Sequence, residues 1–100
     1  MIADDATVAD ALSTIDQNGY GVCFITSSED VLLGTLSDGD IRRALLKGTT
    51  LKDQSVGIMN TDFISLPVQS DNLTILKTLS SKIKVIPLLS DSGMVMDLAT

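Results

Sequence analysis

An internal repeat is the feature that most constrains how this chain can fold. When the sequence is shifted by 63 residues without a gap, residues 20–37 fall on residues 83–100. Both segments read as an apolar strand, a polar turn and a second apolar strand, and they end on a hydroxyl, Ser37 or Thr100. The short turn predicts an antiparallel hairpin. A period near 60 residues is too long for the common solenoids, so we expect two half-domains that share one core.

Helix signals surround these hairpins. Thr7 and Asp10 form a capping pattern before an apolar stripe, and Asn18-Gly19 ends it. Asp71 or Asn72 begins the matching helix of the second copy. The predicted elements are a helix over 7–19, strands over 21–26 and 31–36, a helix over 37–48, a strand over 63–66, a helix over 71–79 and strands over 83–89 and 94–98.

These elements predict an α+β fold made of two pseudo-symmetric β-α-β-β-α repeats packed through their sheets. Residues 1–53 form the first repeat and the connector, and residues 54–100 form the second repeat.

The charge and hydropathy exclude several classes of partner. Seven Lys and Arg against thirteen Asp and Glu give a net charge of −6, which argues against a nucleic-acid surface. No stretch approaches the roughly 18–20 apolar residues of a membrane span. The start, Met1 to Asp5, lacks the cationic segment of a secretory signal. We therefore expect a cytoplasmic protein.

The residue types also argue against catalysis. The chain has no histidine and one cysteine, so the commonest general base, a disulfide and a thiolate metal cluster are all missing. Ser37 has no base to activate it. Cys23 is predicted to be a small buried apolar residue, and Met59, Met94 and Met96 are predicted to fill gaps in the core. We expect a binding module and not an enzyme.

Gly34, Ser37 and Asp40 follow one another at three-residue steps. This motif, within a duplicated β-α-β-β-α unit, resembles a tandem pair of cystathionine-β-synthase (CBS) domains, also called a Bateman module. The longer string over residues 37–48, together with Ile58-Met59-Asn60, resembles the CBS pairs fused to sugar-phosphate nucleotidyltransferases. A similar string occurs in CBS pairs of arabinose-5-phosphate isomerases. The sequence departs from the family pattern in three places. Asp97 stands where the family usually has glycine, the chain ends before the second expected aspartate, and most of the leading strand before Ala6 is missing. The resemblance therefore implies a chain truncated at both ends, with a second repeat that is incomplete at the C-terminus.

The resemblance implies a regulatory module that binds AMP, ADP or ATP, needs no cofactor, dimerises through its helices and is attached to a catalytic domain. The ligand-binding residues that it implies are Gly34, Ser37, Asp38, Asp40, Arg42, Arg43, Thr7 and Thr100. Asn60 also matches a family position near the cleft.

The chemistry of these residues suits such a ligand. A glycine in a strand permits close approach of another group, and the free N–H groups of a helix start suit a phosphate. The two oxygens of Asp40 can accept both hydroxyl protons of a ribose, and Arg42 or Arg43 can neutralise phosphate. The charge of −6 favours one phosphate over three.

Simpler interpretations stand beside these. Ser37 and Asp40 also form an ordinary helix cap, and Arg42 and Arg43 also suit a solvated helix face. Thr7, Asn60 and Thr100 also suit caps and turns. Asp38-Gly39-Asp40 lacks the third carboxylate that a metal site needs nearby. The alternative functions are a structural dimerisation module with an empty cleft and the CBS pair of an arabinose-5-phosphate isomerase.

Overall fold

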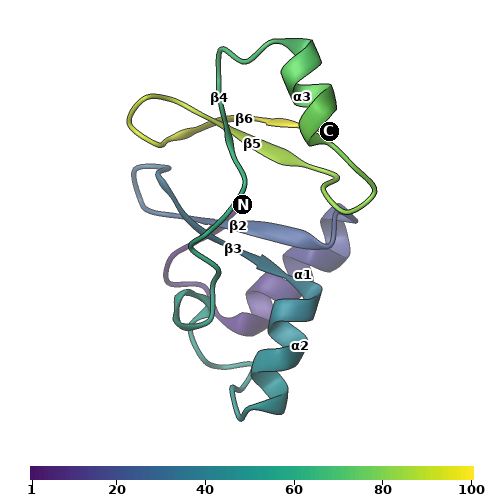
Figure 1. Cartoon of the computed structure of the whole chain (residues 1–100). Coiled ribbons are helices and arrows are strands. Elements are labelled where there is room, and N and C mark those ends of the chain that lie inside the picture. The colour runs from purple at the N-terminus through teal and green to yellow at the C-terminus, as the bar shows by residue number, and fades with distance from the viewer. The chain divides into compact units, whose positions relative to one another are not determined.

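Each copy of the repeat builds its own three-stranded sheet. In the computed structural model, which describes all 100 residues, the chain divides into two compact units, Met1–Phe63 and Ile64–Thr100 (Figure 1). The strand orders are β1-β2-β3 in the first unit and β4-β5-β6 in the second. With three α-helices and two sheets, the α+β prediction is confirmed.

The first unit combines its sheet with two helices. Strand β1 (Ile2–Ala3) pairs in parallel with β2 (Val22–Thr26), and β2 pairs antiparallel with β3 (Leu32–Ser37). Helices α1 (Val8–Asn18) and α2 (Asp38–Leu46) lie on one face of this sheet (Figure 1). A 3-10 turn, η1 (Ser55–Gly57), follows.

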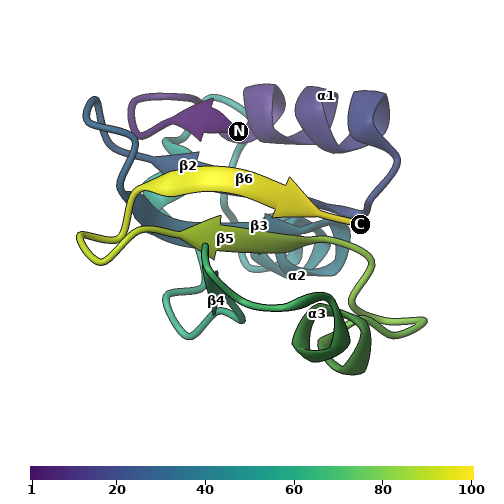
Figure 2. The same cartoon turned by 90° about the horizontal axis from the view of Figure 1, so that it is seen from above.

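The second unit has the same order of elements as the first, from its leading strand to the second strand of its hairpin. Strand β4 (Leu66–Pro67) pairs in parallel with β5 (Ile86–Leu89), and β5 pairs antiparallel with β6 (Val95–Ala99), as Figure 2 shows from above. Helix α3 (Asn72–Thr78) joins β4 to β5.

The registers confirm the repeat in the hairpins. Ile25 lies opposite Gly34 in the first unit, and Leu88 lies opposite Asp97 in the second, both 63 residues later. The register shift after Ile25 recurs after Leu88. Because a slip of one residue would turn every side chain to the other face, this agreement means that equivalent positions face the same way.

Local signals explain α1. The Thr7 hydroxyl accepts a hydrogen bond from the Asp10 N–H at 3.2 Å, and the Asp10 carboxylate accepts one from the Thr7 N–H at 3.0 Å. Gly19, with φ +72°, ends the helix in the left-handed conformation that glycine adopts without strain.

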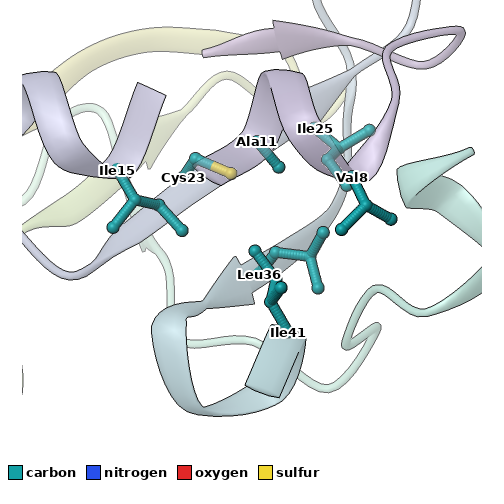
Figure 3. Close-up of a cluster of buried hydrophobic side chains, with 7 residues drawn as sticks. All are labelled: Val8, Ala11, Ile15, Cys23, Ile25, Leu36 and Ile41. Carbon is teal, nitrogen blue, oxygen red and sulfur yellow. The ribbon is translucent and has the colours of Figure 1, made fainter. Parts of the chain in front are cut away.

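The first unit has an aliphatic core beneath its sheet. Figure 3 shows side chains of α1, β2, β3 and α2 pointing toward one another, and the cluster comprises Val8, Ala11, Ile15, Cys23, Ile25, Leu36 and Ile41. Cys23 is 1% exposed, which confirms it as a buried residue. Alternation along β2 brings Cys23 and Ile25 to the face that the helices cover.

The segment after α2 packs onto the first unit. The backbone carbonyls of Asp53 and Leu51 accept hydrogen bonds from the Val8 and Ala9 N–H groups at 2.9 and 3.0 Å. The buried Ser55 hydroxyl donates to the Ala6 carbonyl at 3.0 Å. The compact units therefore divide between Phe63 and Ile64. The division of the repeats after residue 53 stays a prediction.

Several expectations for the second unit are wrong. Met96 is 56% exposed and does not fill the core. Helix α3 leaves the apolar side chains of Leu73 and Leu76 at 60% and 67% exposed. An apolar face is buried only where another element packs on it, and α3 is the only α-helix of its unit. The strand predicted over 63–66 begins instead at Leu66, and the one predicted over 83–89 begins at Ile86. No helix combines the length and the apolar character needed to cross a membrane.

Candidate functional site

The junction between β3 and α2 holds most of the predicted site residues. Ser37 is the last residue of β3 and caps α2, with its hydroxyl accepting from the Asp40 N–H at 3.1 Å. The Asp40 Oδ2 atom accepts from the Ser37 N–H, also at 3.1 Å. The predicted capping interaction is therefore confirmed, and it fixes the Asp40 carboxylate at the start of the helix.

Asp40 is also paired with a cation. Its Oδ1 atom accepts from Nη2 of Arg43 at 2.8 Å, and its side chain is 29% exposed. Partial burial opposes ionisation of Asp40, but hydrogen bonds from Ser37 and Arg43 and the charge of Arg43 outweigh it and lower the pKa of Asp40 below 3.8. Each carboxylate oxygen has two acceptor positions, so Asp40 retains capacity to accept further hydrogen bonds.

The other charged residues of α2 form a more exposed pair. Arg42 and Asp38 approach to 3.2 Å with side chains 70% and 57% exposed, so this ion pair contributes little to stability. The Arg43 guanidinium behaves differently, because it folds back over the first turn. Its Nη1 atom lies 3.4 Å from the point where a Cβ would stand on Gly39.

Some of the backbone N–H groups at the start of α2 already donate hydrogen bonds within the chain. The Asp38 N–H donates to the Gly21 carbonyl at 3.1 Å, and the Asp40 N–H donates to Ser37. The Gly39 N–H makes no hydrogen bond within the chain. It therefore remains open to an acceptor, beside the Arg43 guanidinium.

Gly34 meets the protein's own chain. A Cβ on Gly34 would stand 2.6 Å from Sδ of Met59 and 2.9 Å from the backbone oxygen of Asn60. Thr35 and Asn60 also exchange two backbone hydrogen bonds, at 2.9 and 2.8 Å. A glycine in a strand predicts that another group approaches the strand closely. Here that group is segment 59–60 of the same chain. Sequence reasoning named these two residues as part of a motif but missed this contact.

Thr7 and Thr100 lie apart from this junction along the chain. Thr7 caps α1, whose next N–H groups, on Val8 and Ala9, already donate to the carbonyls of Asp53 and Leu51. Thr100 is an exposed residue of the second unit, directly after β6. The structure therefore brings together Gly34, Ser37, Asp38, Asp40, Arg42 and Arg43 within β3 and α2.

A cavity of about 460 Å³ lies beside the α2 start, and sequence reasoning missed it. Leu12 and Ile15 of α1 give it an apolar wall, and Asp38 links it to the α2 residues. Gly19 and Gly21 also line it, and a Cβ on either would meet no atom within 4 Å. The two glycines in this loop are the sequence feature that could have predicted an open space here.

The chain shows no cluster of three or more His, Cys, Asp or Glu side chains that could hold a metal ion. Burial raises the pKa of the Cys23 thiol to about 11, so this thiol stays protonated at neutral pH.

Comparison with known families finds a match within the first unit. Residues 1–47 match the family model described as the CBS domain. Two uncharacterised proteins from two strains of Helicobacter pylori are 41% and 39% identical over 54 residues, which is 54% of this chain and 16% of each relative. The match thus spans about a sixth of the length of these curated relatives.

Solved structures share the fold of the whole chain. Staphylococcus aureus OpuCA has a TM-score of 0.80 at 21% identity, over 100% of this chain and 83% of that one. The cystathionine beta-synthase pair domain of a Shewanella oneidensis protein also has a TM-score of 0.80 at 21% identity, covering 99% and 57%. A CBS domain protein from Streptococcus pneumoniae has 0.78 at 16%, covering 98% and 70%.

Proposed function

We propose that this chain is a regulatory CBS pair whose first unit binds an adenosine nucleotide at the start of α2, as part of a cytoplasmic sugar-phosphate nucleotidyltransferase. The match of residues 1–47 to the CBS domain supports a non-catalytic, regulatory role. The observation that carries the ligand proposal is the Asp40 carboxylate, which is held in place by Ser37 and Arg43 and still has acceptor positions.

In this proposal each part of the junction meets one part of the nucleotide. The ribose hydroxyls donate to the remaining acceptor positions of Asp40. The phosphate accepts from the Gly39 N–H and lies beside the Arg43 guanidinium. AMP is favoured over ADP and ATP, because a chain with a net charge of −6 repels added phosphate charge.

Regulation then follows from linkage. A nucleotide that binds one arrangement of the module more tightly than another shifts the population toward that arrangement. The attached catalytic domain senses the shift if the two arrangements affect it differently. The Helicobacter pylori relatives are several times longer than the matched segment, which supports a module within a larger protein. The string over residues 37–48 supports a nucleotidyltransferase as that protein.

Calorimetric titration with AMP, ADP and ATP tests the ligand proposal. We expect AMP to bind, and Asp40→Ala to weaken binding at least tenfold, since about 1.4 kcal/mol of lost hydrogen bonding corresponds to that factor. Asp10→Ala is the matched control, because Asp10 has the same capping role in α1. Absence of binding heat with all three nucleotides would contradict the proposal, as would equal losses in the two variants.

A dimerisation module without a ligand is the second candidate, and the exposed Leu73 and Leu76 of α3 favour it. Under this proposal the chain is a dimer in sedimentation equilibrium without nucleotide, and the double change to serine at these positions yields monomers. A wild-type chain that stays monomeric in the micromolar range contradicts this candidate.

A further inference from the structure

Asn18 and Gly19 form the one Asn-Gly pair of the chain, at the point where α1 ends. An asparagine side chain can lose ammonia when the backbone nitrogen of the next residue attacks its carboxamide carbon. Glycine at the next position favours this attack, because it has no side chain to hinder the ring that forms and its backbone is the most flexible. The other two asparagines, Asn60 and Asn72, are followed by residues with branched side chains, which hinder the reaction.

The reaction needs water as its co-reactant and nothing else. The Gly19 nitrogen gives up its proton to solvent and forms a bond to Cγ of Asn18. The bond from Cγ to Nδ2 breaks, and this nitrogen takes up a proton and leaves as ammonia. Water then adds to either carbonyl of the cyclic imide and opens the ring, which leaves aspartate or isoaspartate at residue 18. The result is a carboxylate in place of a neutral carboxamide.

The folded chain holds both reacting groups in place. The Gly19 N–H donates to the Ile15 carbonyl at 3.2 Å, so the end of α1 binds the attacking nitrogen. The Asn18 carboxamide is fixed by the next residues of the chain, because its Oδ1 atom accepts from the Tyr20 N–H at 2.8 Å and its Nδ2 atom donates to the Val22 carbonyl at 3.0 Å. Ring closure requires the nitrogen to lose its proton and the carboxamide to turn toward it. These hydrogen bonds must therefore open first.

The product does not fit the contacts that the reactant makes. A carboxylate at residue 18 has no N–H to donate to the Val22 carbonyl, so two acceptors would face each other. It also places a negative charge at the C-terminal end of α1, where the helix dipole disfavours one. Asp16 and Asp38 line the same cavity as Gly19, so the new charge adds to two existing ones nearby.

We propose that Asn18 is a site of spontaneous deamidation, which the native hydrogen bonds of the turn between α1 and β2 suppress. The reaction proceeds from states in which this turn is open, and its product then disfavours closure of the turn. The extent of deamidation at residue 18 therefore records how often the turn has opened. Because Gly19 and Gly21 of this turn line the cavity beside α2, the modification also changes the charge at the rim of that cavity.

Mass spectrometry of the full chain tests the suppression. Wild type is incubated folded and in urea at mildly alkaline pH, and fragmentation of the peptide that contains Asn18 locates the modification. We expect deamidation in the folded chain to be at least tenfold slower than in urea, with the Gly19 amide protected from hydrogen exchange by a comparable factor. In urea, Gly19→Ala should slow the reaction, and Asn60 and Asn72 should react more slowly than Asn18. Equal rates in the folded and unfolded chain, or an unprotected Gly19 amide, would overturn the proposal.

Urea unfolding of two variants tests the effect of the product. Asn18→Asp copies the aspartate product. Gln17→Glu is the matched control, because it adds the same charge one residue earlier on an exposed side chain, whose hydrogen bond to Ser13 spans 3.5 Å. We expect Asn18→Asp to raise the unfolding equilibrium constant about tenfold more than Gln17→Glu does, since the partly buried Val22 carbonyl loses its donor. Equal effects of the two variants would contradict the proposal that the product disfavours closure of the turn.

Discussion

The Sδ atom of Met59 lies 2.6 Å from the point where a Cβ would stand on Gly34. The backbone oxygen of Asn60 lies 2.9 Å from the same point. The flexible Met59 side chain can move, but the Asn60 oxygen is fixed by its bridge to Thr35. Gly34 therefore serves the attachment of the segment after α2, whatever else binds near it.

Gly34→Ala should destabilise the first unit by about 1–3 kcal/mol, the usual cost of overpacking. Urea unfolding followed by circular dichroism measures the change. Gly57→Ala is the control, since a Cβ on Gly57 meets no atom within 4 Å. Equal midpoints for the two variants would show that residues 59–60 move aside without cost.

Ile41 and Leu46 lie on the same helix but differ in burial, with 1% and 82% of their surfaces exposed. Ile41→Ala should cost about 2–5 kcal/mol, because it opens a cavity in the core cluster. Leu46→Ala should change the unfolding free energy by less than about 0.5 kcal/mol. Thermal and urea unfolding check both, and similar losses would mean that α2 is not anchored through Ile41.

Asp40 should give the fold part of its acid sensitivity. Its pKa in the folded chain lies below the ordinary value of 3.8, so its stabilising contribution is present above about pH 4 and is lost as the pH falls through the folded pKa. Asp40→Asn should therefore be less stable than wild type near neutral pH, and the difference in unfolding free energy should narrow as the pH falls below about 4.

Unfolding in urea at several pH values measures this difference. Asp16→Asn, which removes the same charge from an exposed residue without a hydrogen bond, is the control variant. Hydrogen bonds from Thr74 also lower the pKa of Asp71, so some acid sensitivity remains in Asp40→Asn. If wild type and Asp40→Asn differed by the same unfolding free energy at every pH, the acid sensitivity would come from groups other than Asp40.

Cys23 should be unreactive in the folded protein. It is 1% exposed and burial raises its pKa to about 11, so little thiolate forms at pH 8. A disulfide reagent that releases a coloured thiol should modify Cys23 only as fast as the chain opens, and at once in denaturant. Ser28→Cys adds an exposed thiol in the β2–β3 turn as an internal reference. Equal rates for the two thiols would contradict the buried position.

Elements with their own local signals could be predicted from the sequence. The Thr7 and Asp10 cap, Gly19 and the stripe of Val8, Ala11 and Ile15 specify α1 with interactions among neighbours in the chain. The Ser37 and Asp40 cap specifies the start of α2 in the same way. These hydrogen bonds join residues three positions apart in the chain, so both partners can be found from the sequence alone.

Contacts between distant segments could not be predicted. Nothing local says that Asn60 bridges Thr35, or that the Asp53 and Leu51 carbonyls occupy the start of α1. An apolar stripe on a helix shows which face is apolar but not whether another element covers it, so the exposure of Leu73 and Leu76 depends on the tertiary structure.

By itself, the sequence determined the repeat, the two hairpins, the helix caps and a chemistry without histidine or paired cysteines. Only the tertiary structure decided that Gly34 accommodates Met59 and Asn60 and that Arg43 folds over Gly39. The physical reason is that side-chain type and spacing determine hydrogen bonds between neighbours in the chain. Steric fit depends instead on which segment, distant in the sequence, packs against a given residue.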